Sequence, residues 1–123
     1  MYAALDAESA ATIGPAAPCP LVIALPGDTE GGVVGGLWGC TMFAWLHIQI
    51  LVVPPAARGQ GLGRALLTRA EAEARARGCI AALVDRFSFQ ADGFYEKCGY
   101  GIFGVLDNYP PGHRRLYLRK SLI

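Results

Sequence analysis

Short apolar blocks bounded by glycine or proline recur along this chain, and their length and composition predict β-strands. The predicted strands cover Leu21–Leu25, Val33–Trp38, Phe43–Val53, Ile80–Val84, Tyr100–Leu106 and Leu116–Leu118, the last with an extension over Arg114–Lys120. Pro26-Gly27 ends the first strand and Pro54-Pro55 ends the third, because proline cannot donate to a β-ladder. The short separation of the first two strands predicts a hairpin.

Apolar positions change to helical spacing in the middle of the chain and predict a helix from Leu62 to about Arg77. Leu66 and Ala70 continue its apolar face, whereas Glu71 and Arg75 are expected to form a solvated i,i+4 pair on the other side. Because this helix joins two predicted strands in a βαβ unit, those strands should run parallel.

Two shorter helices complete the expected elements. An alanine-rich stretch, Ala3–Ala11, is compatible with one, and Ser88–Lys97 with the other, which Gly99 would end. No internal repeat or linker divides the 123 residues, so we expect one domain over residues 1–123.

The composition is apolar for a soluble chain, with 53% hydrophobic and 17% charged residues, and is compatible with a homodimer. No apolar run reaches the roughly 18 to 20 residues that span a membrane, and no secretory signal is recognisable, so we expect no membrane partner. The four cysteines include no C-x-x-C pair, which argues against a metal site. We expect them to be reduced and mostly buried in a cytoplasmic protein.

Charge is distributed unevenly along the chain although the net charge is only +1. Residues 1–57 carry −4 and residues 58–123 carry +5, and all eleven basic residues lie in the second part. The low net charge argues against nucleic-acid binding. The basic half fits a small polyanionic ligand, although a chance asymmetry in a small domain would look the same.

A glycine-rich turn separates the third predicted strand from the long helix. It reads Arg58, Gly59, Gln60, Gly61, Leu62, Gly63 and Arg64. Glycine at every second position leaves the backbone amides uncovered and permits positive φ angles, and the helix directs its positive dipole end at the turn. With an arginine on each side, this arrangement indicates a phosphate or pyrophosphate site rather than an ordinary flexible connection.

The same turn also allows a nucleotide-dependent oxidoreductase, because Asp85 follows about twenty residues later, as in a dinucleotide-binding fingerprint. The glycine spacing is GxGxG rather than GxGxxG, however, and Pro54–Ala57 separates the strand from the turn. A Walker phosphate loop would need Lys-Ser or Lys-Thr after the turn, which the chain lacks.

Two motifs in this order resemble the GNAT superfamily of acetyl-CoA-dependent N-acetyltransferases. The first is Arg58-x-x-Gly61-x-Gly63, and the second is Tyr95-Glu96-Lys97-Cys98-Gly99-Tyr100, about thirty residues later. The resemblance implies an α+β fold with a mixed, mostly antiparallel central sheet flanked by helices. Two neighbouring parallel strands, Ile48–Val53 and Ile80–Val84, would splay apart around the cofactor.

The resemblance also implies how acetyl-CoA would be held. Its pantetheine arm would pair with backbone groups of Leu51, Val52 and Val53, and its pyrophosphate would rest on the amides from Arg58 through Arg64. Ser88 stands where the family often has an asparagine that contacts the cofactor arm.

Catalytic roles follow from the same resemblance. Tyr95 matches the residue that protonates the departing CoA thiolate, although an aromatic residue there could instead be a core residue. His47 is a candidate base, because His47, Gln49 and Leu51 would share one face of a regular strand, although the sequence favours a hydrogen-bonded structural histidine. Asp85 is a second candidate base, unless it pairs with Arg86 or caps the following turn.

The acceptor is expected to be a small-molecule or peptide amine. Tyr109, His113 and Arg114 lie in or beside the loop that borders the acceptor pocket in this fold. Only about twenty residues precede Leu21, where the family usually has a strand and two helices, so we expect a shortened N-terminal part and an altered acceptor wall. A CoA-binding module without catalytic activity is the alternative.

Overall fold

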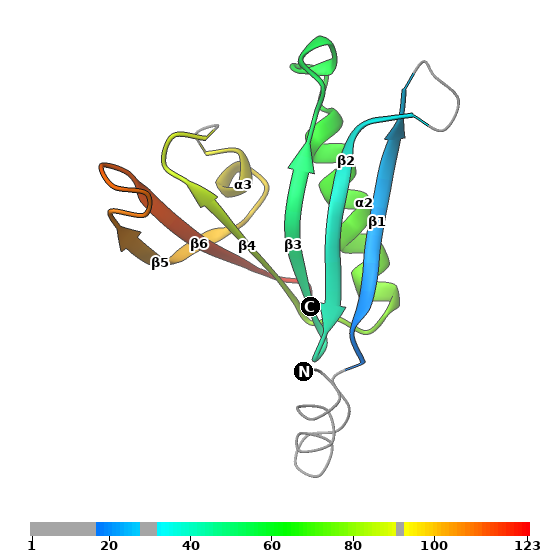
Figure 1. Ribbon diagram of the computed structural model, residues 1–123. Helices are drawn as coiled ribbons and strands as arrows, with labels where there is room; N and C mark the ends of the chain where they lie inside the picture. The colour runs from blue at the N-terminus through cyan, green and yellow to red at the C-terminus, as the bar shows by residue number, and fades with distance from the viewer. Residues whose placement is uncertain (1–16, 28–31, 91–92) are drawn as a thin grey trace.

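A six-stranded sheet organises the computed structural model, which describes residues 17–27, 32–90 and 93–123. The strands are β1 (Cys19–Pro26), β2 (Val33–Met42), β3 (Trp45–Val52), β4 (Ala81–Phe87), β5 (Gly101–Asp107) and β6 (Arg114–Ser121). They are ordered β1-β2-β3-β4-β6-β5, and β3 and β4 run parallel while the other neighbours run antiparallel. The expected mixed sheet of an α+β fold is confirmed (Figure 1).

The parallel pair is joined over only part of its length. Pairing runs from Trp45 with Ala81 to Ile48 with Val84, and beyond these residues the two strands separate. Figure 1 shows the result as two arms, with β1, β2, β3 and α2 in one and β4, β5, β6 and α3 in the other. The predicted splay between the parallel strands is therefore present.

The long helix α2 (Leu62–Ala76) follows a 3-10 turn, η1 (Pro55–Ala57), and packs against β1, β2 and β3. It ends in a Schellman motif, in which Gly78 N–H donates to Arg75 O and Cys79 N–H to Ala74 O. Gly78 has a φ of +85°, a conformation that glycine adopts without strain. The predicted end of this helix is confirmed.

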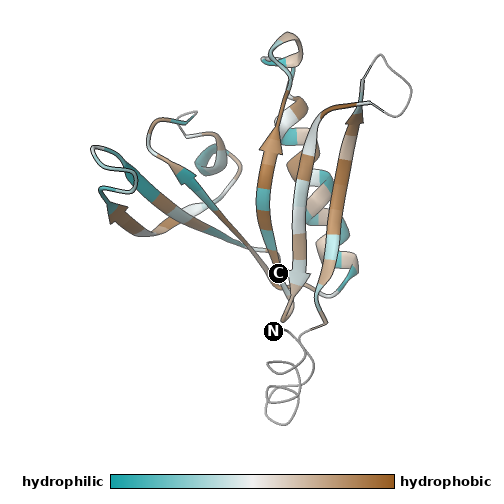
Figure 2. Cartoon of the chain, in the orientation of Figure 1, coloured by the Kyte–Doolittle hydropathy of each residue, from teal (hydrophilic) through white to brown (hydrophobic). Residues whose placement is uncertain are grey.

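The hydrophobic core lies between α2 and the sheet. Its largest fully buried side chains are Leu21, Leu37, Leu46, Ile48, Leu67, Val84 and Leu118. Burying each of these contributes roughly 1.5–3 kcal/mol relative to exposure. Apolar residues also continue along the edge strand β5, where Ile102 and Phe103 are about half exposed (Figure 2). In the described residues, no helix is long and apolar enough to cross a membrane.

Two predicted elements, a strand and a helix, have wrong boundaries because turns interrupt them. Phe43 and Ala44 have φ of +53° and +61° and form the two-residue turn between β2 and β3, so the strand predicted from Phe43 begins at Trp45. The second helix, α3, covers only Phe94–Lys97. Ser88 does not begin a helix, because it exchanges hydrogen bonds with the backbone of Arg114. The expected helix at 3–11 lies outside the described residues.

The burial of two residue types also differs from expectation. Glu71 is buried, with only 4% of its surface exposed, and forms no solvated pair with Arg75, whose Nε donates to Leu122 O. Of the four cysteines, which are all unpaired thiols, only Cys79 is buried. Tertiary contacts from β6, which local spacing does not report, account for the position of Glu71.

Candidate active site

The glycine turn has the geometry of an anion-binding site. Gly59 and Gly61 have φ of +82° and +76°, and a Cβ built at either position would meet no atom within 4 Å. The backbone at these two positions is therefore open to a ligand, and Gly61 is the N-cap of the fifteen-residue helix α2, which has no acidic residue in its first turn. Unpaired amides and the positive helix end favour a bound phosphate.

Gly63 serves a different purpose within the same turn. A Cβ there would lie 3.3 Å from the ring of Phe94 and 3.5 Å from Cγ2 of Val53. The glycine allows the start of α2 to approach α3 closely, so it brings the turn next to the helix that carries Tyr95.

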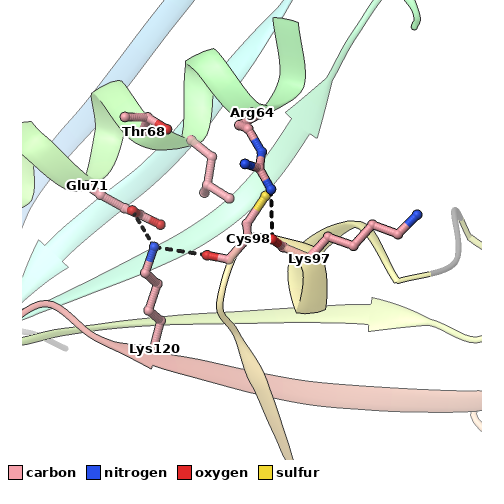
Figure 3. A pocket seen from close by; sticks show the side chains of 7 residues that line it. Arg64, Thr68, Glu71, Lys97, Cys98 and Lys120 are labelled. Atoms are coloured by element: carbon pink, nitrogen blue, oxygen red, sulfur yellow. Dashed lines mark hydrogen bonds and ion pairs between the residues drawn. The ribbon is translucent and has the colours of Figure 1, made fainter. Parts of the chain in front are cut away.

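The two flanking arginines are held by backbone carbonyls. Arg58 Nε donates to Val53 O at 3.3 Å, and Arg64 Nη2 donates to Lys97 O at 2.7 Å. Arg58 is exposed and stays beside the end of β3, whereas Arg64 connects α2 to α3. Arg64 also borders a cavity of about 150 Å³ between these helices, which Thr68, Glu71, Cys98 and Lys120 help to line (Figure 3).

We expect Arg58→Ala to weaken acetyl-CoA binding by about 1.5–2 kcal/mol, or roughly 10- to 30-fold, because an exposed charge-assisted contact to a phosphate would be lost. Isothermal titration calorimetry measures the change. Arg69→Ala is the matched control, since Arg69 is an exposed arginine further along α2. Equal affinity of the two variants would remove Arg58 from the binding site.

The end of β3 presents an unpaired edge toward β4. After Ile48, no strand among the described residues pairs with this edge, so backbone groups at Leu51 and Val52 are available to an extended ligand. Val53 continues the chain and accepts the hydrogen bond from Arg58. The expected position of the pantetheine arm stays a prediction. It requires an unpaired strand edge, and the edge of β3 beyond Ile48 has no partner among the described strands.

A β-bulge changes which side chains share a face of β3. Trp38 pairs with Ile50 and Gly39 with Ile48, which leaves Gln49 as an extra residue. Leu51 consequently packs toward the core, whereas His47 is exposed. The prediction that His47 and Gln49 share the face of Leu51 is wrong, because it assumed a regular strand. The role of His47 as a base stays a prediction.

Tyr95 lies on α3, packed edge-on against the rings of Phe94 and Tyr100 with centroids 5.1 and 5.8 Å apart. Burial, and then electrostatic interactions with Asp85 and Cys98, raise the pKa of Tyr95 to about 12. The phenol is therefore protonated at neutral pH and can donate a hydrogen bond.

Asp85 is already engaged on the side of the sheet that lacks α2. Its Oδ2 accepts from Arg115, with both Nε and Nη2 at 2.8 Å, and Arg86 instead pairs with Glu96. The predicted alternatives for Asp85, a pair with Arg86 or a cap, are therefore wrong.

Aromatic side chains surround the Arg115 guanidinium, which lies 4.9 to 5.5 Å from three ring centroids. These rings belong to Phe87, Tyr109 and Tyr117. Side chains alternate between the two faces of a strand, so the sequence could have shown which residues of β4 and of β6 share a face. That Phe87 pairs with Arg115 was not predictable.

The β5–β6 loop adds the residues expected near the acceptor. Tyr109 is 46% exposed, and His113 lies edge-on to Phe89 at 5.0 Å. Arg114 is exposed, and its backbone N–H donates to the Ser88 hydroxyl oxygen at 2.9 Å. Ser88 thus ties the end of β4 to β6, and its predicted contact with the cofactor stays untested.

Comparison with known proteins identifies the family. The model of the acetyltransferase (GNAT) family matches residues 4–100 of this chain. The chain belongs to the GNAT acetyltransferase family. Blasticidin-S acetyltransferase of Streptomyces morookaense is 45% identical over 94 residues, which cover 76% of this chain and 69% of that protein. Acetyltransferase Atu2258 of Agrobacterium fabrum is 41% identical over 93 residues, covering 76% and 68% of the two chains.

Solved structures agree with this GNAT assignment. An acetyltransferase from Bacillus cereus ATCC 14579 superposes with a TM-score of 0.78 and 36% identity, over 86% of this chain and 75% of that one. An aminoglycoside 6′-N-acetyltransferase complexed with coenzyme A, at 22% identity and a TM-score of 0.71, shares the fold.

The GNAT assignment settles the class of reaction. The protein is an acetyl-CoA-dependent N-acetyltransferase, and neither the oxidoreductase nor the CoA-binding module without activity has support from the matches. Within the described residues, no group of three or more histidine, cysteine or acidic side chains is arranged to hold a metal ion.

Proposed function

We propose that this GNAT enzyme acetylates a small-molecule primary amine by direct attack in a ternary complex. The observation that carries the proposal is the open edge of β3, which starts where β3 and β4 part and ends beside the glycine turn. An extended cofactor arm can pair with this edge while its pyrophosphate occupies the turn, which places the thioester between the two arms of the sheet.

The reaction requires few groups from the protein. The amine lone pair attacks the thioester carbonyl, the C–N bond forms, the C–S bond breaks, and the nitrogen loses one proton. Tyr95 donates a hydrogen bond to the departing thiolate, and His47 or a water takes the proton from the amine. The exchange is downhill, because an amide is more stable than a thioester, and orientation of the two substrates supplies part of the rate acceleration.

The acceptor class rests on the relatives. Blasticidin-S acetyltransferase, whose name gives its acceptor, is 45% identical to this chain, so blasticidin S is the first amine to test. Peptide amines form the second class. The rings around Arg115 and the exposed Tyr109 lie where the β5–β6 loop meets β4, and we propose that this surface contacts the acceptor.

A two-stage experiment tests the function. In thermal-shift measurements, acetyl-CoA and CoA at about 100 times their Kd should stabilise the protein by about 2.7 kcal/mol, and NAD should not. Thiol release from acetyl-CoA should then depend on an added amine. Stabilisation by CoA without turnover of blasticidin S or of any amine or peptide in a panel would refute the catalytic proposal.

A further inference from the structure

The helix that carries Tyr95 cannot hold its own position. α3 has four residues, and so short a helix is not stable in isolation. Its location must come from contacts with other elements. Two of these are the packing of the Phe94 ring on Gly63 and the ion pair between Glu96 and Arg86, at 3.0 Å.

Two cations bind the carboxyl end of α3. Arg64 Nη2 donates to Lys97 O at 2.7 Å, and Lys120 Nζ donates to Cys98 O at 2.9 Å (Figure 3). Carbonyl groups at a helix end lack helical partners and carry partial negative charge, so both contacts are favourable. One cation comes from the start of α2 and the other from β6, and together they fix α3 from two sides.

A buried carboxylate sets the position of Lys120. Glu71 Oε1 accepts from Lys120 Nζ at 2.9 Å, and Glu71 Oε2 accepts from the Tyr100 hydroxyl at 2.8 Å. The Glu71 side chain is 5% exposed, so this charge is costly to bury unless both oxygens are bound. Burial, and then the hydrogen bond to Glu71, raise the pKa of Tyr100, which keeps its hydroxyl a donor.

The network reaches Tyr95 along two routes. Tyr100 N–H donates to Tyr95 O at 3.0 Å, and the two rings are in edge-on contact. Lys120 holds the carbonyl of Cys98, the residue that caps α3. A shift of Glu71 or Lys120 would therefore move the backbone of Tyr95 and its ring together.

We propose that Glu71 and Lys120 are positioning residues for acetyl transfer, which hold the phenol of Tyr95 beside the thioester sulfur. This inference rests on the proposed role of Tyr95. Glu71 lies seven residues after Arg64 on α2, so one helix, which begins at the glycine turn, carries both Arg64, which binds α3 directly, and Glu71, which binds it through Lys120. The turn that holds the pyrophosphate and the phenol that meets the sulfur are thus fixed relative to each other.

A double-mutant cycle tests the inference. Lys120→Met removes the ammonium and keeps most of the side-chain length. We expect it to lower kcat about tenfold and to leave the KM for acetyl-CoA unchanged. This loss is smaller than the ~100-fold fall in rate that a misplacement of about 1 Å can cause. When Tyr95→Phe is also present, Lys120→Met should cause no further fall in kcat, because Lys120 acts through the phenol.

Controls separate positioning from stability. Lys120→Arg keeps the charge and should retain most of kcat, and Glu73→Gln, an exposed carboxylate on the same helix, should leave kcat unchanged. Tyr100→Phe, which removes one hydroxyl, replaces Lys120→Met in the cycle if the latter does not fold. Assays are run well below each variant's Tm.

The outcomes distinguish this inference from the proposed function. Amine turnover by the unmodified enzyme, measured first, decides the function. An equal fall in kcat with and without Tyr95→Phe would overturn the positioning role alone. An unaltered kcat in Tyr95→Phe would overturn the role of Tyr95 and the positioning role with it, while acetylation itself would stand.

Discussion

Tyr95→Phe should lower kcat by about 10- to 100-fold with little change in the KM for acetyl-CoA. The substitution removes one hydroxyl and keeps the ring, whose packing against Phe94 and Tyr100 holds α3 in place. The lost interaction is a hydrogen bond to a developing thiolate, and such bonds to charged groups contribute about 1.5–3 kcal/mol. Because the thiolate forms only in the transition state, the loss appears in kcat. Steady-state kinetics with a saturating amine measures it.

The pKa of Tyr95 limits what the phenol can do. At about 12 it exceeds the roughly 8.5 of an ordinary thiol, so complete proton transfer to the thiolate would be uphill by about 5 kcal/mol. Tyr95 therefore acts as a hydrogen-bond donor, present in its protonated form at every pH below about 12. We expect kcat to show no decline between pH 8 and 10 caused by Tyr95. A decline in that range that disappears in Tyr95→Phe would contradict this raised pKa.

Local signals in the sequence were sufficient to predict the backbone geometry of the glycine turn. Gly59 and Gly61 predict their own positive φ angles, because few other residues adopt them, and the helix after the turn follows from apolar spacing. The parallel pair of β3 and β4 could also be predicted, because a strand, a helix and the next strand follow one another directly in the sequence. These features depend on residues that are close in the sequence.

Features that depend on distant partners could not be predicted. The bulge at Gln49 arises in the pairing of β3 with β2 and shifts His47 and Leu51 to different faces, although each strand by itself reads as regular. Glu71 stands four residues after Leu67 and three before Ala74, on the buried face of α2, but a carboxylate at that position reads as solvated as long as its partners are unknown. Its partners Tyr100 and Lys120 are 29 and 49 residues away, and only the fold brings them to it.

Glu71→Ala should destabilise the fold by about 3 kcal/mol, because it removes one partner of a buried ion pair. This is near the lower end of the ~3–5 kcal/mol range for such a loss, since the Lys120 side chain is 25% exposed and can regain some water. The Tyr100 hydroxyl, which is buried, also loses its acceptor. Urea unfolding followed by circular dichroism gives the free energy of unfolding.

Glu73→Ala is the matched control for this loss. Glu73 lies two residues away on α2 and forms an exposed i,i+4 pair with Arg77, worth about 0.3–0.5 kcal/mol. The two substitutions make the same chemical change on one helix, so the difference between them measures burial and partners rather than helix propensity. If the free energy of unfolding fell by less than about 1 kcal/mol in both variants, the buried carboxylate would not stabilise the contacts between α2, α3 and β6. Tyr95 would then need to be held in place by other contacts.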